Sequence, residues 1–327
     1  MRHNSSWVLA ALAGLATPAL AGDLGWGMPP AALDWTGQAS HATPDETVRL
    51  KAGLGLMLLE ANEYVYLGNY TLSHLIWQSK APVLRGSVAV NVGHGLFVEA
   101  EGSVAAYGTS YMEDYDWLAG DDTPANWTHR SQHPDTHIDH YWTGSLAVGY
   151  ELARADDAVV RLHGGLKYTD VQWSAYGGSY VYSTGGFRDD AGAFPDGAPG
   201  ITYRQQLPEA FIGVDGDQYY GNFRVGGLLR GGLTFAAVAT DDHWMRDLRF
   251  YDYLNVAPTL ALGADVGFAL GPMAELVMAA RYDQIFEQRG ETRTYDTTTG
   301  NLAGISPDTG AGDLRSFELT AGIRGNF

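Results

Sequence analysis

The chain has 327 residues, with 20 Lys and Arg against 38 Asp and Glu, so its formal net charge is −18 at pH 7. This balance argues against a nucleic-acid-binding protein, which needs a basic surface. The sequence has no cysteine, which excludes disulfides, thiolate zinc sites and cysteine nucleophiles. Any reactive group must therefore be a carboxylate, a histidine, a serine or a tyrosine.

Residues 1–21 are typical of a secretory signal peptide. Arg2 supplies a positive start, Trp7–Ala16 an apolar segment, and Pro18–Ala21 a cleavage site of small residues. We predict that the mature chain, a single domain of residues 22–327, begins at Gly22. An exported chain without cysteine fits a bacterial envelope protein better than a eukaryotic secreted one.

Apolar and polar residues alternate in many segments of the mature chain, and no segment has the ~20 apolar residues of a membrane helix. In chain order the alternation is clearest at Val48–Leu58, Leu96–Ala106, Phe223–Phe235, Leu254–Phe268, Leu276–Tyr282 and Phe317–Phe327. A period of two predicts β-strands with one apolar and one polar face. The runs are longer than the about five or six residues usual for strands of soluble sandwiches.

Charged residues occur at the centres of these polar faces. They are Glu99, Glu101, Arg224, Arg230, Arg281 and Arg324. Such residues suit the lumen of a transmembrane β-barrel, where they can pair across strands while the apolar rows contact lipid. Paired charges would also plug the lumen, so a passive pore is the least favoured of the functions that a barrel could have.

Turn signals divide the chain into short and long connections, as outer-membrane barrels require. The predicted tight turns are Gly93–Gly95, Ala155–Asp157, Gly216–Asp217 and Leu270–Pro272, and the predicted outer connections are Glu113–Asp135, Ser183–Pro199, Thr240–Asp247, Arg289–Asp313 and one near Gly68–Asn69. We therefore predict an all-β, ten-stranded antiparallel transmembrane barrel. Its strands of about 15–20 residues would project above the outer membrane. Gln38–Glu46 is a predicted leader, and Pro258 should lie near a strand end or bulge.

Two groups of acidic and histidine residues lie in the long outer connections. Asp114 and Asp116 are separated by one residue, as are Asp241 and His243. In extended backbone, residues two apart project to the same side. Two neighbouring carboxylates raise at least one pKa, and an Asp that accepts a hydrogen bond from a His fixes its tautomer. Together, the two pairs could hold and deprotonate a water molecule, although acidic outer loops could also only bind cations or solvent.

The strand period places these four residues on the outward face. Counting by twos from the lipid-facing rows leads to this result for both the third and the seventh strand. The pairs can face the barrel mouth only if a bulge or loop intervenes. We predict such irregularities at Gly108 and within Ala237–Thr240.

A histidine cluster in the first long connection suggests a metal site or a serine triad. It consists of His129, His133, His137 and His140. No H-E-x-x-H motif is present, and Pro134 opposes the helix that such a motif occupies. Ser131 lies near His133 in sequence, which is weak evidence for a triad. We expect no metal and a supporting role at the base of the loop.

Several segments resemble the omptin family of outer-membrane aspartic-type proteases. They are Tyr111–Trp117, Trp127–Thr136, Gly177–Ser183, Phe187–Asp190, Phe194–Gly197, His243–Leu248 and Leu319–Gly322. The likeness runs in order from about Glu63 to Phe327. It implies a monomeric ten-stranded barrel of the bacterial outer membrane that cleaves peptides at the outer face, commonly beside basic residues and without a covalent intermediate.

The resemblance also implies roles for individual residues. His243 would be the general base toward a water molecule also held by Asp114, with Asp241 orienting the imidazole and Asp116 supporting the couple. Glu63 matches the glutamate that receives a basic P1 side chain, the residue before the cleaved bond.

The sequence departs from the family pattern at two places. Ala239 stands where the family usually has an acidic residue, so the P1 preference is expected to be weaker or altered. Asp242 could compensate, but its side chain should point away. Leu166, Tyr168, Asp170 and Gln206 stand where the family tends to have Tyr, Glu, Arg and Arg in contact with lipopolysaccharide. A requirement for lipopolysaccharide, typical of the family, is therefore questionable, and no other cofactor is expected.

The prediction is an outer-membrane endopeptidase that hydrolyses exposed peptides or proteins near basic residues. Cationic peptides would be drawn to its acidic mouth. The alternative is a proteolytically weak relative that acts as an adhesin or surface-binding barrel. Peptide cleavage separates the two, because adhesion would survive substitution of the Asp and His pairs.

Overall fold

The computed structural model describes residues 47–327, which form a continuous antiparallel sheet. Its strands are β1 (Val48–Leu67), β2 (Tyr70–Gly93), β3 (Leu96–Ala105), β4 (Thr109–Asp116), β5 (His129–Arg154), β6 (Ala158–Tyr176), β7 (Ser179–Tyr182), β8 (Asp190–Ala193), β9 (Pro199–Tyr220), β10 (Phe223–Thr234), β11 (Ala237–His243), β12 (Leu248–Leu254), β13 (Pro258–Gly271), β14 (Ala274–Asp296) and β15 (Leu302–Asn326). Two short 3₁₀ helices, η1 (Pro124–Asn126) and η2 (Trp244–Arg246), lie in connections. The predicted signal peptide and the leader Gln38–Glu46 lie outside the described residues.

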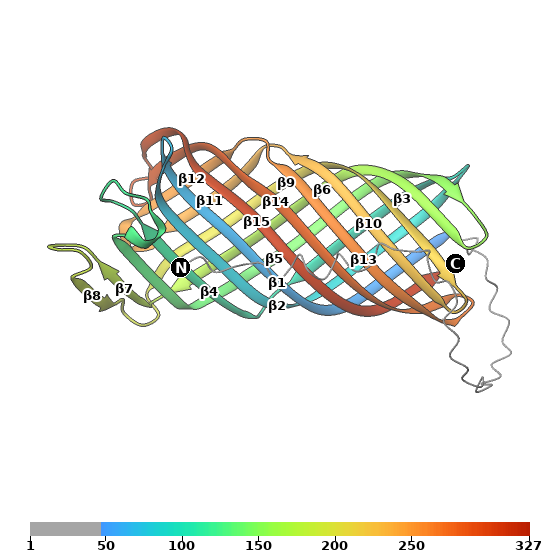
Figure 1. The fold of residues 1–327 in the computed structure, drawn as a ribbon. Coiled ribbons are helices and arrows are strands. Elements are labelled where there is room, and N and C mark those ends of the chain that lie inside the picture. The colour runs from blue at the N-terminus through green and yellow to red at the C-terminus, as the bar shows by residue number, and fades with distance from the viewer. Residues whose placement is uncertain (1–46) are drawn as a thin grey trace, which may run out of the picture. The chain divides into compact units, whose positions relative to one another are not determined.

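These segments close into a barrel of ten strands (Figure 1). β3 and β4 are successive parts of one strand, because both pair with β2 and β5. β10 continues into β11 beside β9, and β12 into β13 beside β14. β15 pairs with β1, for example Ala321 with Leu54, which closes the ring. The predicted ten-stranded antiparallel barrel is confirmed.

The outer surface carries the apolar rows that the alternation predicted. On β1, Leu56 is 69% exposed whereas its neighbour Met57 is fully buried. This lipid-facing row ends at Leu58, and the next outward side chain, Glu60, forms an ion pair with Arg315. Residues of β1 beyond Glu60 therefore lie outside the apolar belt. No helix within residues 47–327 is long and apolar enough to cross a membrane.

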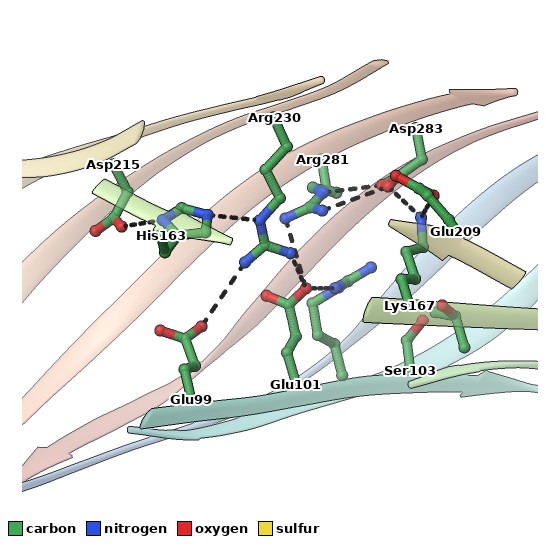
Figure 2. Close-up of polar contacts among 12 residues, drawn as sticks. Glu99, Glu101, Ser103, His163, Lys167, Glu209, Asp215, Arg230, Arg281 and Asp283 are labelled. Atoms are coloured by element: carbon green, nitrogen blue, oxygen red, sulfur yellow. Dashed lines mark hydrogen bonds and ion pairs between the residues drawn. The ribbon is translucent and has the colours of Figure 1, made fainter. Parts of the chain in front are cut away.

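The lumen holds the predicted charges in ion pairs that link opposite sides of the barrel (Figure 2). Arg230 donates to His163 at 2.9 Å and to Glu101 at 3.2 Å. Arg224 binds Asp217, Asp265 and Glu275, Arg281 binds Asp283, and Arg324 lies 3.5 Å from Asp217. Charged side chains are stable in this interior because each has an oppositely charged neighbour.

Most of the uninterrupted strands are longer than the predicted 15–20 residues, and β1 and β6 fall within that range. The uninterrupted ones have 19 residues, in β6, to 26 residues, in β5. Only about 9–11 residues are needed to cross the membrane, so the barrel projects beyond it. Two predicted outer loops are accordingly wrong in extent: Glu113–Asp135 shrinks to residues 117–128, and Arg289–Asp313 to residues 297–301. Their polar composition reflects contact with water, but the strand ladder continues there.

The turn predictions have mixed outcomes. The turns at Gly93–Gly95 and Ala155–Asp157 and the connection at Gly68–Asn69 are confirmed, and Pro258 is the first residue of β13, as expected. The turn predicted at Leu270–Pro272 lies slightly later in the chain, because β13 continues to Gly271 and β14 begins at Ala274.

The predicted turn at Gly216–Asp217 is wrong. Both residues lie within β9, and the chain turns at Gly221–Asn222, where Gly221 has a φ of 59°. The acidic residue that suggested a turn is a lumen ligand of Arg224, with 2.7 Å between the charged atoms. The connection Ser183–Pro199 contains β8, which pairs with β7 as a hairpin at one end of the barrel (Figure 1).

Candidate active site

A bulge separates β3 from β4 and reverses which residues face the interior. Ala105 pairs with Val83 and Thr109 with Lys80, so four residue steps on one strand oppose three on the other. Tyr107 takes the left-handed conformation, with a φ of 59°. A Cβ on Gly108 would lie 2.4 Å from the Lys80 carbonyl oxygen, so only glycine fits this close approach. The bulge predicted at Gly108 is confirmed, and even-numbered residues of β4 face inward.

A second one-residue bulge separates β10 from β11. Thr234 pairs with Glu209 and Val238 with Gln206, again four steps against three. The left-handed residue is Ala236, with a φ of 49°. The bulge thus precedes β11, and its predicted place within Ala237–Thr240 is wrong by one residue.

Strand β11 carries two of the predicted site residues. Asp241 and His243 belong to this strand and not to the loop predicted at Thr240–Asp247. The preceding bulge turns both side chains toward the interior.

Strand register brings the acidic pair of β4 next to β2 and β1. Asp114 lies opposite Leu75, which in turn lies opposite Glu63. Side chains opposite each other share one face of a sheet, so this row points into the barrel. Ser73, opposite Asp116, donates its hydroxyl to Asp114 Oδ1 at 3.2 Å. Ser73 is thus a site residue that the sequence did not reveal.

The aspartate and the histidine of β11 form a close contact. His243 Nε2 lies 2.6 Å from Asp241 Oδ2, and the Phe250 ring packs edge-on against the imidazole. Asp241 is 3% exposed. Because a carboxylate only accepts hydrogen bonds, Nε2 carries the proton and Nδ1 is left as the basic nitrogen.

Burial and like charges perturb the titration of the site. The pKa of Asp114 is held well above its usual range by burial and by the neighbouring Asp116. Burial also raises the pKa of Asp116, against the effect of a hydrogen bond from Ser73. Burial alone would lower the pKa of His243, but the Asp241 charge and hydrogen bond outweigh it and raise that pKa above 6.5. The charge of His243 also lowers the pKa of Asp114, and the charge of Asp114 raises the pKa of His243. The two pairs therefore lie close enough to interact inside the barrel.

Glu63 lies in the interior beside these pairs. It is 3% exposed, and its Oε2 atom has no hydrogen-bond partner among residues 47–327. The pKa of Glu63 is raised well above its usual range by burial, then by the charges of Asp241 and Asp252. The structure therefore brings all five predicted site residues to the same region.

Residues 44–327 match the model of the omptin family. The chain belongs to the omptin family. It is similar to the plasminogen activator of Yersinia pestis, with 27% identity over 88% of this chain and 91% of the relative. It is also similar to the outer membrane protease OmpP of Escherichia coli, with 28% identity over 88% of this chain and 93% of the relative.

A solved structure shares the fold of this omptin. The crystal structure of outer membrane protease OmpT from Escherichia coli superimposes with a TM-score of 0.81 at 24% identity. The match covers 88% of this chain and 98% of the other. This omptin is an outer-membrane β-barrel, and its family membership supports a protease function.

The departures of this omptin from its family have structural counterparts. Asp242 points away from the pair, as expected, because its carboxylate binds Arg249 at 2.6 and 2.9 Å. On the outer surface, Gln206 donates to the Tyr168 hydroxyl, and Arg204 and His140 bind Asp170. Leu166 is exposed to the surroundings.

The four histidines of the first connection do not converge on one point. His133 Nε2 lies 2.9 Å from Ser131 Oγ, and its ring stacks on Phe194 beside the β7–β8 hairpin. The hydrogen-bond partners of the others are Thr128 for His129, Asp135 for His137 and Asp170 for His140. Among residues 47–327, no group of three or more His, Asp or Glu side chains is placed to hold a metal ion.

Proposed function

We propose that this omptin is an endopeptidase whose Asp241–His243 and Asp114–Asp116 pairs activate a water molecule at the outer end of the barrel. The observation that carries the proposal is the pair of bulges, which turn two motifs far apart in sequence toward one interior space. Relatives named as outer membrane proteases support the same activity.

His243 acts as the general base. Asp241 holds the Nε2 proton, so the Nδ1 lone pair takes a proton from the water, whose oxygen attacks the scissile carbonyl carbon. Asp241 then stabilises the imidazolium. When the tetrahedral intermediate collapses, His243 returns the proton to the leaving amine, so no covalent enzyme intermediate forms.

The aspartate couple holds the other side of the water. Asp114, fixed by Ser73, accepts a hydrogen bond from it, while burial and mutual repulsion keep one proton shared with Asp116. Removing one charge in this way lowers the repulsion between the couple and the developing oxyanion.

The acidic mouth favours cationic substrates. A net charge of −18 attracts basic peptides, and the buried Glu63 carboxyl faces the interior where a P1 Lys or Arg would enter. We propose that the barrel acts as a monomer, with lipopolysaccharide as its surrounding lipid.

Arg246 should set the pH at which His243 becomes active. Its Nη1 lies 3.5 Å from His243 Nδ1, and its positive charge lowers the pKa of the imidazole. Arg246→Gln should therefore raise that pKa and move the acid limb of the kcat/KM profile to higher pH, since this limb reports the free enzyme's base. The control is Arg249→Gln, which removes a cation bound to Asp242 instead. An acid limb that stays in place would refute this role.

Cleavage-site mapping tests the proposed function. Purified, refolded protein is incubated with a mixed peptide library, with and without lipopolysaccharide, beside the His243→Ala variant. We expect cuts next to Lys or Arg that disappear in the variant. No cleavage under either lipid condition would favour an adhesin, and cleavage that persists in the variant would reject the mechanism.

A further inference from the structure

A buried aspartate lies directly across the sheet from Ala239, the position where the family usually has an acidic residue. Asp252 of β12 pairs with Ala239 of β11. Opposed side chains in an antiparallel pair share one face, with Cβ atoms about 4.5–5.5 Å apart. Asp252 is 4% exposed, so its carboxylate points into the same interior as the side chain that Ala239 lacks.

The surrounding strands are shaped to hold this carboxylate. Thr292 donates its hydroxyl to Asp252 Oδ1 at 2.5 Å. A Cβ on Gly310 would lie 2.0 Å from the same Oδ1 and 2.6 Å from the Thr292 hydroxyl. Any side chain at position 310 would displace Asp252, so the glycine keeps this place open for the carboxylate.

Asp252 completes a group of three buried carboxyls with Glu63 and Asp241. The three residues come from different strands, and beside burial, the charge of Asp241 raises the pKa of both Glu63 and Asp252. Asp241 has His243 as its partner, whereas within residues 47–327 neither Glu63 nor Asp252 forms an ion pair with a basic side chain. The Oε2 atom of Glu63 is buried and has no hydrogen bond to any residue that the structure describes. Unpaired buried carboxyls cost stability, and a cation from outside would compensate them.

We propose that Asp252 and Glu63 together receive the cationic P1 side chain of the substrate, with Asp252 supplying from β12 the second carboxylate that Ala239 cannot supply. This assignment rests on the proposed function. It predicts that the preference for Lys or Arg is preserved despite the alanine.

The carboxyls of Glu63 and Asp252 should bind a cation more tightly as the pH rises. Burial raises the pKa of Asp252 to about 7, against the Thr292 hydrogen bond, and burial and neighbouring carboxyls hold the pKa of Glu63 well above its usual range. The other titratable groups facing them are Asp241, Asp114 and Tyr203. Without a bound cation, these carboxyls are therefore partly protonated near neutral pH. A bound guanidinium would expel those protons, so the KM for a basic P1 peptide should fall between about pH 6 and 8.

The test compares two peptides that are identical except for Arg or Gln at P1. Asp252→Asn, with the volume kept and the charge removed, should lower the Arg-to-Gln ratio of kcat/KM roughly 10- to 100-fold, mainly through KM. Cleavage of the Gln peptide should fall by much less than cleavage of the Arg peptide, because the water-activating groups are untouched. Moving the charge back in Ala239→Asp/Asp252→Asn should restore the ratio. A purely structural role of Asp252 would not produce this rescue.

Binding without turnover separates this assignment from the proposed function. In the His243→Ala background, Asp252→Asn should weaken binding of the Arg peptide, measured by calorimetry in detergent, roughly 10- to 100-fold and leave the Gln peptide unaffected. That result would support the assignment even if the wild type cleaved neither peptide. An unchanged Kd for the Arg peptide, or an unchanged Arg-to-Gln ratio, would overturn it.

Discussion

Asp241→Asn should lower kcat/KM for peptide cleavage by about 10⁴-fold, as expected when a histidine base is held in the wrong tautomer. The carboxylate now accepts the Nε2 proton at 2.6 Å and leaves Nδ1 basic. An asparagine amide in its place would donate to Nε2, which moves the proton to Nδ1 and removes the lone pair that accepts a proton from water. The loss should appear in kcat, measured on refolded protein with a peptide that is cleaved by the wild type.

The adjacent residue provides a matched control for this substitution. Asp242→Asn makes the same chemical change one position away, but Asp242 binds Arg249 on the opposite face of β11. Its activity should remain within a few-fold of wild type. If both variants cleave at the wild-type rate, Asp241 does not set the tautomer of His243.

Arg224→Met should lower the free energy of unfolding by roughly 3–5 kcal/mol, the usual effect of removing one partner from a buried ion pair. Arg224 is 1% exposed and bridges Asp217, Asp265 and Glu275 at 2.5–2.8 Å. Without the guanidinium, these carboxylates would face one another in the lumen. Denaturant unfolding of the refolded barrel in detergent micelles measures the effect.

An exposed ion pair of the same type is the control for the lumen substitution. Arg293 binds Glu291 at 2.7 Å, and both side chains are about two-fifths exposed. Arg293→Met should change the free energy of unfolding by no more than about 1 kcal/mol. Equal losses in the two variants would show that the lumen network does not stabilise the barrel.

Alternation of side chains was sufficient to predict the ten strands and their lumen charges. Prediction of turns and loops from local composition failed at Gly216–Asp217 because a glycine next to an aspartate is common in turns, whereas here Asp217 is an ion-pair ligand within β9. It also failed at the long outer loops. Polar residues indicate contact with water, and both a loop and a strand beyond the membrane satisfy that condition.

The two bulges show what counting residues by twos along a strand can predict and what it cannot. The count revealed that each acidic motif needed a reversal, and Gly108 located the first one. Nothing comparable marked the second, because its left-handed residue is Ala236 and not a glycine.

Ser73 and Asp252 could not be predicted because their importance depends on strand register. Ser73 contacts Asp114 only because β2 and β4 pair as they do, and Asp252 lies opposite Ala239 only through the pairing of β11 with β12. Neither pair of residues is spaced along the sequence in a pattern that would predict its contact. Arg246 was within reach of local reasoning, since it lies three residues after His243, but its contact depends on the short helix η2.

The most direct test of the central claim is a double-mutant cycle on the initial cleavage rate. It compares wild type, His243→Ala, Asp114→Ala and the double variant, all refolded and assayed with one peptide. If the two pairs activate one water molecule, each single variant should lose roughly 10²–10⁴-fold in kcat. The double variant should then be no slower than the slower single variant, because groups that act as a unit are not additive. Losses that multiply in the double variant, or a single variant that retains the wild-type rate, would contradict a shared site.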